Sequence, residues 1–352
     1  MGGKGKIFLL IWAILMTFIA GGLVGFEALR LFGRQSLDTK SATTAPILNL
    51  DTPVTASSTP TVWEADWVRY NGSVYDYNED ITTFLIMGID KDDEVVTQVA
   101  EGTDGGQADS LFLLVLNPHD SSIRIIGINR NSMTDVDIYD EYGRYQTTVV
   151  AQIATQHGFG NGLEESCEYQ VKAVSNMFYR LPIHGYAAIN MSAIPAINDQ
   201  IGGVDVVVLE DLSNVDKKLK EGEEVHLEGD SAFVYVKYRD IEKYGSNDDR
   251  LERQRQYLNE FIKKAREESA ENSNLAIELF SAIREKMVTN ISPDEVSYLA
   301  PFLSSYRFDP QDFLMIEGTT EKTGKFEEFH IDEDKLYQTI LDVFYEKIDN
   351  VD

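Results

Sequence analysis

Short apolar runs separated by polar turns predict the strands of this chain. The runs have the length and the partial alternation of buried or half-buried strands. The segment 117–122, Asn-Pro-His-Asp-Ser-Ser, is typical of a turn between two of them. We expect strands at Thr82–Asp90, Ser110–Leu116, Ile123–Asn129, Val204–Leu209 and Ala232–Arg239.

Apolar residues at helical spacing predict helices between and after these strands. Asp248 precedes one helix as a candidate cap, and Ser292 with Glu295 three residues later has the pattern of a capping box. Strands and helices together indicate a mixed α/β domain. The expected helices are Leu163–Arg180, Asp249–Glu267, Asn274–Lys286, Pro293–Ser305 and Glu333–Lys347.

The N-terminal region contains an uncharged run of 19 residues, Ile7–Gly25. A helix of about 20 apolar residues crosses a bilayer, and a cleaved signal peptide has a shorter apolar core of roughly 7–15 residues. We therefore expect a retained transmembrane anchor over 7–29 behind a short tail, 1–6. Lysines and arginines flank the run on both sides, so the charges do not decide its orientation.

The segment after the anchor is rich in Ser, Thr, Ala and Pro between residues 36 and 64. Such a composition buries too little apolar surface to order itself. We expect a flexible linker over 30–77, followed by a single large domain over 78–352.

The charge and the cysteine content exclude several classes of protein. A formal net charge of −28 disfavours nonspecific binding of nucleic acid or anionic lipid through the bulk surface. Cys167 is the only cysteine among 352 residues, which excludes an intrachain disulfide and a cysteine metal cluster.

Polar residues at three strand ends point to a common site. If the turn at 117–122 joins an antiparallel hairpin, Asp109 and Arg130 meet at the same sheet edge. If the strand that ends at Asp90 is also antiparallel to its successor, Asp90 joins them. Two carboxylates and an arginine would then converge.

Cations from a second region extend this cluster. In the expected strand over residues 232–239, Lys237 and Arg239 share one face, and Arg250 and Gln254 share a face of the following helix. Arginine presents a planar fork to phosphate oxygens, and Mg²⁺ takes carboxylates together with phosphate and water. The set therefore fits metal-assisted phosphoryl transfer.

Simpler explanations apply to each residue taken alone. Aspartates at strand ends are commonly turn formers, and residues 237–255 carry six basic against five acidic residues, as an ion-paired helix face would. The glycine-rich segment 158–162 is typical of a plain loop. His157 has no metal-ligand spacing, and Cys167 is interpreted as a small apolar helix residue.

The order of these landmarks resembles the LytR–CpsA–Psr family. The resemblance covers about residues 80–266 and rests on the order and spacing of the motifs rather than on any one of them. The matching segments are the N-terminal anchor, Phe84–Asp90, Asp109-Ser110, Ile128–Asn131, Gly202–Val206, Tyr235–Arg239 and Arg250–Gln254.

The resemblance implies a central mixed sheet flanked by helices, with a hydrophobic tunnel for a polyprenyl chain. It implies a phosphotransferase that moves a glycopolymer from a polyprenyl-pyrophosphate carrier to peptidoglycan, with the catalytic domain outside the cell membrane and the N-terminus inside. Asp90 and Asp109 would hold Mg²⁺ or Mn²⁺. The pyrophosphate would be gripped by Arg130, Arg239 and Arg250, with further contacts from Lys237, Gln254, Arg253, Gln107 and Asn131.

The chain departs from the family pattern at several of these positions. Gln107 stands where an arginine is common, Asn131 replaces an aspartate, Lys237 replaces an arginine and Asn247 replaces an aspartate. A charge-assisted hydrogen bond contributes roughly 1.5–3 kcal/mol, so each change weakens the site while both metal ligands and three arginines remain. We favour an active enzyme. The alternatives are a noncatalytic binder of the carrier or the wall polymer, a pyrophosphatase, and a membrane-anchored regulator. A regulator would need a cytoplasmic effector surface, for which the six-residue tail is too short.

Overall fold

The computed structural model describes residues 32–37, 39–40, 45–48, 67–91, 105–140, 142–240, 242–324 and 326–348. The predicted anchor over 7–29 and much of the predicted linker lie outside these residues. Within them, no helix combines the length and the apolar character needed to cross a bilayer.

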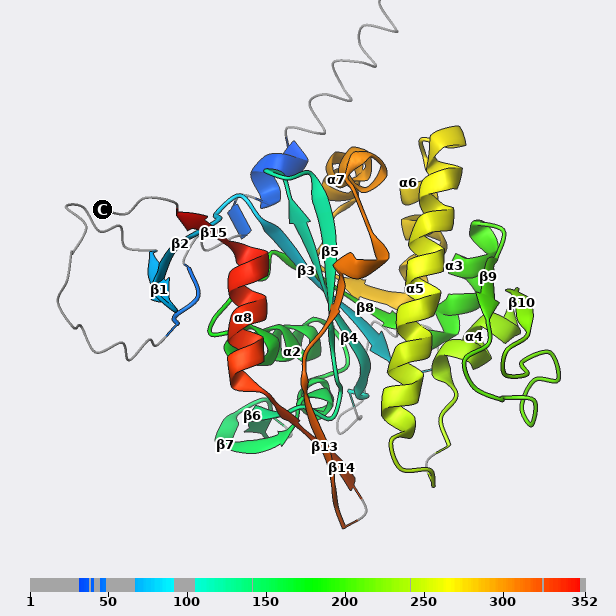
Figure 1. The fold of residues 1–352 in the computed structure, drawn as a ribbon, viewed down its shortest axis with the longest axis horizontal. Coiled ribbons are helices and arrows are strands. Elements are labelled where there is room, and N and C mark those ends of the chain that lie inside the picture. Colours follow the sequence, from blue (N-terminus) through cyan, green and yellow to red (C-terminus); the bar gives the residue numbers. More distant parts are fainter. Residues whose placement is uncertain are drawn as a thin grey trace, which may run out of the picture.

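A six-stranded mixed sheet forms the centre of the domain (Figure 1). Its middle strands β3, β4 and β5 are antiparallel neighbours, and β3 is parallel to β8 while β5 is parallel to β12. The strand order is β11 (Met287–Thr289), β8 (Gly185–Asn190), β3 (Thr82–Ile89), β4 (Ala108–Asn117), β5 (Ser122–Ile128) and β12 (Phe313–Met315). The mixed α/β class and the antiparallel β4–β5 hairpin are confirmed.

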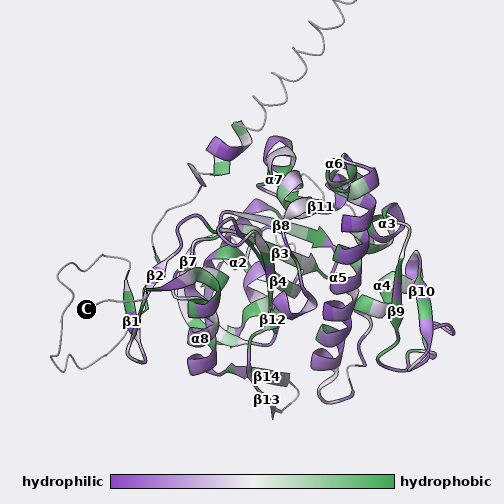
Figure 2. Ribbon diagram, turned by 45° about the horizontal axis from the view of Figure 1, so that its top comes forward, coloured by the Kyte–Doolittle hydropathy of each residue, from purple (hydrophilic) through white to green (hydrophobic). Residues whose placement is uncertain are grey.

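Helices cover both faces of this sheet (Figure 1). Helices α2 (Glu164–Met177) and α8 (Glu333–Phe344) pack on one face through the main apolar core. The other face is covered by α3 (Ile194–Gln200), α5 (Ser246–Glu271), α6 (Leu275–Ala282) and α7 (Pro293–Ser305). Figure 2 shows α5 and α8 hydrophilic along much of their length and the central strands hydrophobic, as burial between layers requires.

Strand β4 serves both faces by alternation. Leu111, Leu113 and Val115 belong to the core under α2 and α8, whereas Phe112 and Leu114 face the helices of the other layer. This is why β4 has a nearly continuous apolar run rather than an alternating one.

Small two- and three-stranded sheets surround this framework. They form where chain segments return to the domain surface, and they were not predicted except for β9. They are β1 (Val68–Tyr70), β2 (Ser73–Tyr77) and β15 (Tyr345–Ile348); β9 (Val204–Val207) and β10 (Glu224–Leu227); β6 (Met133–Tyr139) and β7 (Tyr145–Gln152); and β13 (Gly318–Thr323) and β14 (Phe326–Ile331).

The predicted strand over Ala232–Arg239 is wrong, because this segment forms the helix α4 (Asp230–Lys237). Tyr235 and Val236 face the buried side, while Lys237 lies one turn after Phe233 with its Nζ 4.9 Å from that ring. β-branched and aromatic residues favour strands only weakly, and tertiary packing overrides that preference here.

Two helix boundaries also differ from the expectation. The predicted helix 333–347 stops at Phe344, because Tyr345–Ile348 pairs with β2 as a strand. Asp248 is not a cap: α5 begins after Gly245, which has a positive φ of 77°. The capping box of Ser292 and Glu295 at the start of α7 is confirmed.

Described parts of the predicted linker pack on the domain, which corrects the expectation of a free segment at those residues. Leu37 is buried against the sheet and α7. Ile47 donates a backbone hydrogen bond to the carbonyl of Tyr179 over 2.7 Å. The contact of Leu37 is apolar, whereas that of Ile47 is made by its backbone.

His119 ties the last strand to the body of the domain. Its Nδ1 lies 2.7 Å from Glu346 of β15 and its Nε2 lies 2.8 Å from Asp80. Hydrogen bonds to Asp80 and to Glu346 raise the pKa of His119 above its ordinary value of 6.5. Because the folded-state pKa is raised, the contribution to stability is fully present below about pH 6.5 and is lost as the pH rises through the folded-state value.

We therefore expect His119→Gln to flatten the loss of stability between about pH 6 and pH 8. Urea midpoints of the wild type and the variant at both pH values measure this. His330→Gln, which removes a histidine from the β13–β14 hairpin, is the control. Equal changes of midpoint for the wild type and His119→Gln would contradict the assignment.

Candidate active site

Asp109 lies between two arginines at one end of the central sheet. Its Oδ1 is 2.6 Å from Arg130 Nη1, and its Oδ2 is 3.2 Å from Arg250 Nη1. The three side chains are only 9%, 12% and 5% exposed, respectively. The hairpin argument that brought Asp109 to Arg130 is confirmed by this contact.

A β-bulge aims the Asp109 side chain. Gly88 pairs with Ser110 and Ile89 pairs with Ala108, so Asp109 is the extra residue of β4. A bulge of this kind redirects one side chain without ending the ladder. Without it, the alternation of β4 would put Asp109 on the same face as Leu111 and away from α5.

Arg250 is held in a buried hydrogen-bond network at the start of α5. Its Nη2 donates to Asn247 Oδ1 over 2.9 Å, and Asn247 Nδ2 donates to Asn129 Oδ1 over 2.9 Å. Asn129 in turn donates to Asp248 Oδ1 over 2.9 Å. The network fixes the rotamer of Arg250, so Asn247 keeps a positioning role although it is uncharged.

Asp90 lies at the same sheet end but is half exposed. Its Oδ1 is 3.2 Å from Lys237 Nζ, and its backbone N–H donates to the carbonyl of Gln107 over 3.3 Å. Lys237 reaches Asp90 from the C-terminal end of α4. The structure thus joins the two predicted groups of residues, although one of them comes from a helix instead of the predicted strand.

Arg239 adds positive charge to the site. Among the residues that the structure describes, no carboxylate forms an ion pair with it. Burial lowers the pKa of Arg130, Asp109 opposes that shift, and Arg239 adds to it. Burial likewise lowers the pKa of Arg250 from 12.5 to about 10, so it stays protonated at neutral pH.

Arg253 and Gln254, which were predicted to contact pyrophosphate, form hydrogen bonds to the backbone of α4 and its C-terminal end. Arg253 donates from Nη1 to the carbonyl of Tyr235 over 2.7 Å and from Nη2 to that of Tyr238, and so holds the C-terminal end of α4. Gln254 donates to the carbonyl of Val236 over 3.0 Å. Their predicted contact with pyrophosphate stays a prediction, and their observed contacts are structural.

Gln107 and Asn131 line a polar cleft of about 270 Å³ beside Arg130. Gln107 Oε1 accepts a hydrogen bond from Arg130 Nη2. Arg130 Nε is buried and finds no acceptor among the described residues. The other lining residues are Gln152, Arg239, Glu242, Lys243, Tyr244, Ser246, Lys322, Phe326 and Glu327.

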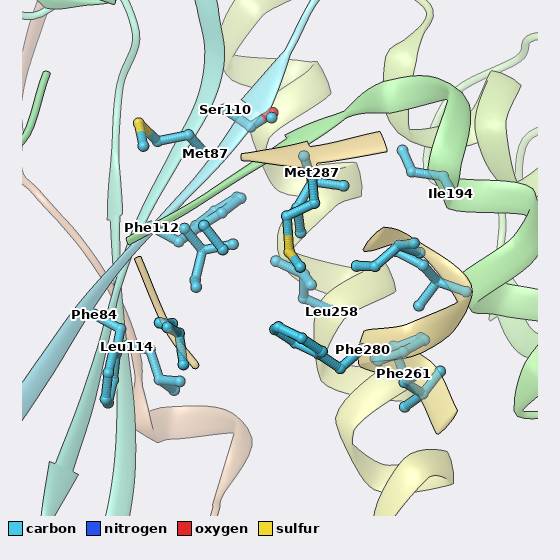
Figure 3. A pocket seen from close by; sticks show the side chains of 18 of the residues that line it. Phe84, Met87, Ser110, Phe112, Leu114, Ile194, Leu258, Phe261, Phe280 and Met287 are labelled. Atoms are coloured by element: carbon cyan, nitrogen blue, oxygen red, sulfur yellow. The ribbon is translucent and has the colours of Figure 1, made fainter. Parts of the chain in front are cut away.

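An apolar cavity of about 450 Å³ extends from the other side of the cluster, between the sheet and α3, α5, α6 and α7 (Figure 3). Its polar end is lined by Gly88, Ser110 and Gln254. In the sequence, Gly88 precedes Ile89, Ser110 follows Asp109 and Gln254 follows Arg253. The Ser110 hydroxyl is buried with no hydrogen-bond partner in the described residues. Further lining residues include Phe84, Phe112, Leu114, Ile189, Leu258, Phe261, Phe280, Met287 and Leu299.

His157 and Cys167 lie together in the buried core. His157 Nδ1 is 3.0 Å from the carbonyl of Gly106, and its Nε2 is 3.8 Å from Cys167 Sγ. Burial raises the pKa of the Cys167 thiol to about 12, which makes it unreactive. The sequence interpretation of Cys167 as a buried apolar residue agrees with this position.

The residues present fit a divalent cation at this edge. Asp90 and Asp109 offer hard carboxylate oxygens, and Mg²⁺ needs only one or two such ligands beside phosphate and water. Each carboxylate accepts about four contacts, so the ion pairs leave room for a metal. Within the described residues, no three His, Cys, Asp or Glu side chains gather into a fuller metal site.

Several parts of the site escaped the sequence analysis. The bulge, the Asn129–Asn247 pair and the Ser110 hydroxyl leave no mark in local composition. Lys243, Lys322 and Phe326 reach the polar cleft only through tertiary folding. The neighbouring motifs Asp109-Ser110 and Asn129-Arg130 were the available signals, and they identified only one residue of each pair.

The sequence is similar to a known protein family and to individual proteins. A family model described as the LytR_cpsA_psr family matches residues 50–341. A Bacillus anthracis protein named polyisoprenyl-teichoic acid–peptidoglycan teichoic acid transferase TagU is 27% identical over 216 residues, which are 61% of this chain and 62% of the relative. The chain therefore spans less than two thirds of that relative. A TagU from Halalkalibacterium halodurans is 28% identical over 248 residues, covering 70% of this chain and 71% of the relative.

Solved structures share the fold. Bacillus subtilis TagV aligns with a TM-score of 0.56 at 23% identity, covering 73% of this chain and 93% of TagV. A TagT structure bound to LI-WTA aligns with a TM-score of 0.56 at 18% identity, covering 75% of this chain and 89% of TagT. These alignments confirm the mixed sheet flanked by helices.

The charge arrangement predicts opposite effects of two substitutions on stability. Asp109→Ala leaves two buried arginines without their carboxylate, and breaking such a buried pair costs about 3–5 kcal/mol. Arg239→Gln removes a cation that repels Arg130 and Arg250, so we expect unchanged or raised stability. Asp249→Ala, which breaks an exposed pair with Lys243, is the control, with an expected loss of less than about 1 kcal/mol. Chemical unfolding at neutral pH measures all three, and a loss for Asp109→Ala no larger than the control's would refute the proposed role of Asp109.

Proposed function

The chain belongs to the LytR_cpsA_psr family, and from this membership and its site we propose that it transfers a phosphate-linked glycopolymer from a polyprenyl-pyrophosphate carrier to peptidoglycan. The observation that carries the proposal is the position of the cationic cluster between an apolar cavity and a polar cleft. A prenyl pyrophosphate glycan has the same order of apolar tail, charged centre and polar head.

The cations define where the pyrophosphate would lie. Arg130, Arg239 and Arg250 lie at one sheet end, with Lys237 opposite Asp90. Arg239 has no competing carboxylate in the described residues, and Arg130 Nε is unpartnered. Guanidinium forks suit phosphate oxygens, so an anion with two phosphates would supply the missing acceptors.

The metal proposal concerns Asp90 and Asp109. When bound, Mg²⁺ or Mn²⁺ would neutralise part of the pyrophosphate charge. Asp109 is already held by two arginines, which keeps its carboxylate in place. Asp90, which is half exposed, would complete the ligand pair at the cost of its contact with Lys237.

The proposed reaction is a substitution at the glycan-linked phosphorus. A hydroxyl of the acceptor attacks this phosphorus, the bond to the bridging oxygen of the pyrophosphate breaks, and polyprenyl phosphate leaves while the hydroxyl proton passes to solvent. Arg130 faces both the polar cleft and Asp109, so it would stabilise the charge that develops on the leaving phosphate. The apolar cavity would keep the prenyl chain, and the polar cleft would hold the glycan.

The remaining parts of the proposal concern location. The uncharged run Ile7–Gly25 would be a single membrane span with the tail 1–6 inside. The domain would then act outside the cell membrane, where peptidoglycan lies. No role in nucleic-acid binding is proposed.

The decisive experiment incubates the purified chain with a polyprenyl-pyrophosphate-linked disaccharide, a peptidoglycan fragment and Mg²⁺. We expect polyprenyl phosphate to be released with formation of a glycan–acceptor product, and EDTA to stop the reaction. Asp90→Asn should lower the metal-dependent rate at least about tenfold, while Asp205→Asn on β9 serves as the control. Release without the joined product would indicate a pyrophosphatase, binding without any release would indicate a noncatalytic binder, and full turnover in EDTA would refute the metal role.

A second prediction separates catalysis from binding at Arg130. We expect Arg130→Lys to lower the maximal rate at least about tenfold, because a point charge does not reproduce the planar fork. The rate is measured at saturating substrate, and the affinity for a nonhydrolysable pyrophosphate analogue is measured in parallel. Weaker binding of the analogue with an unaltered maximal rate would assign Arg130 to substrate binding alone.

A further inference from the structure

The segment that follows the predicted membrane span is docked on the domain. Residues 32–37 and 39–40 are helical, and Gly33, Leu37 and Lys40 recur at a spacing of four and three residues, which places them on one helix face. A Cβ added to Gly33 would lie 2.5 Å from the backbone oxygen of Asp294 in α7. The two backbones are therefore in close contact, and a larger residue at position 33 would separate them.

Two further contacts hold this docking helix (residues 32–37 and 39–40). Leu37 is 4% exposed and packs in one apolar cluster with Phe84, Leu116, Ile123 and Leu299. Lys40 Nζ lies 2.7 Å from the carboxylate of Glu295, whose side chain is fully buried. An ion pair with a buried partner is a specific contact, because either residue alone would leave an uncompensated charge.

The docking helix lies at one end of the apolar cavity. Phe84, Leu116 and Leu299 line the cavity and belong to the same apolar cluster as Leu37. The opposite end of the cavity is formed by Gly88, Ser110 and Gln254 beside the cationic cluster. The cavity thus runs along β3 and β4 from the charged cluster to the docking helix.

The chain length limits the distance of this end from a membrane. Gly25, the C-terminal residue of the segment Ile7–Gly25, precedes Gly33 by eight residues. Even fully extended, eight residues span at most about 29 Å. A docked position 33 therefore keeps α7 within that distance of Gly25.

The charge of the chain opposes a close approach of the domain to a membrane. A domain that contributes to a net charge of −28 is repelled by an anionic bilayer. On a free linker, the domain would therefore stay away from the membrane with no fixed face toward it. Docking removes this freedom.

We propose that the docking helix binds α7 to hold the far end of the apolar cavity at the bilayer, so that the apolar tail of a lipid-linked substrate runs from the cavity directly into the membrane. This inference rests on the proposed function for the identity of the tail. The partner is the lipid phase itself, reached beside the exposed Phe32. The charged cluster, at the other end of the cavity, then faces away from the membrane.

Energy transfer to an acceptor lipid tests the orientation without any need for turnover. The full chain is placed in vesicles and labelled at Ser297→Cys on α7 or at Glu321→Cys on β13, at opposite ends of the domain in Figure 1. Cys167 is buried, so the introduced cysteine takes the label. We expect clearly stronger transfer from position 297 than from position 321.

Variants of the docking face make this test specific. Leu37→Asp and Gly33→Leu should each reduce the difference between the two labels, and Gln35→Asp, on the exposed side of the same helix, should retain it. Leu37→Asp and Gly33→Leu differ in chemistry, so one of them still tests the inference if the other disturbs the fold. A stronger signal from position 321, or a difference that survives both variants, would overturn the inference.

A comparison of two substrates tests the consequence for the tail. For a long-chain carrier embedded in vesicles, Leu37→Asp should lower kcat/KM at least about fivefold, whereas a short-chain water-soluble analogue should change less than about twofold. An equal loss on both substrates, or no loss on either, would overturn the role of the docking helix. If the wild type turns over neither substrate, the proposed function fails, and the energy-transfer result still decides the orientation.

Discussion

The charged site depends on the ion pairs that the Asp109 carboxylate forms with Arg130 and Arg250. Three arginines converge on one sheet end, and two of them are nearly buried. Without an anion among them, repulsion and loss of hydration would drive them apart. One bulged aspartate therefore lets β5 and α5 bring their cations together, and the Asn129–Asn247 network extends this order into α5.

Two environments meet at this carboxylate. One face of the sheet presents the apolar residues of β3 and β4 to α5, α6 and α7, and beyond the sheet end the hairpin of β13 and β14 contributes to a polar cleft. A cationic cluster at such a boundary is costly to build, and within the described residues the Ser110 hydroxyl and Arg130 Nε are buried without a hydrogen-bond partner. Stability is given up there in exchange for a site that an amphipathic anion completes.

The sequence allowed the central strands and the Asp109–Arg130 contact to be predicted because both depend on local information. A turn at 117–122 and a fixed count of residues on each side place these two side chains together. The helix α4 was mistaken for a strand because Phe233, Val234 and Tyr235 suit either structure, and only packing against α5 decides between them. The bulge at Asp109 could not be predicted, since it arises from a register shift between two strands. The docking helix could not be predicted, because the composition around it is polar.

The burial of these arginines would affect the rate of the proposed catalytic cycle. In the proposed reaction the leaving product is a prenyl phosphate, which carries its negative charge among the same arginines that stabilised its formation. Its tail stays in the apolar cavity, so both ends of the product retain their contacts after the bond has broken. Product departure rather than bond cleavage would then limit turnover. Replacement of the spent carrier by a fresh one along the cavity would set the pace at which polymer reaches the wall.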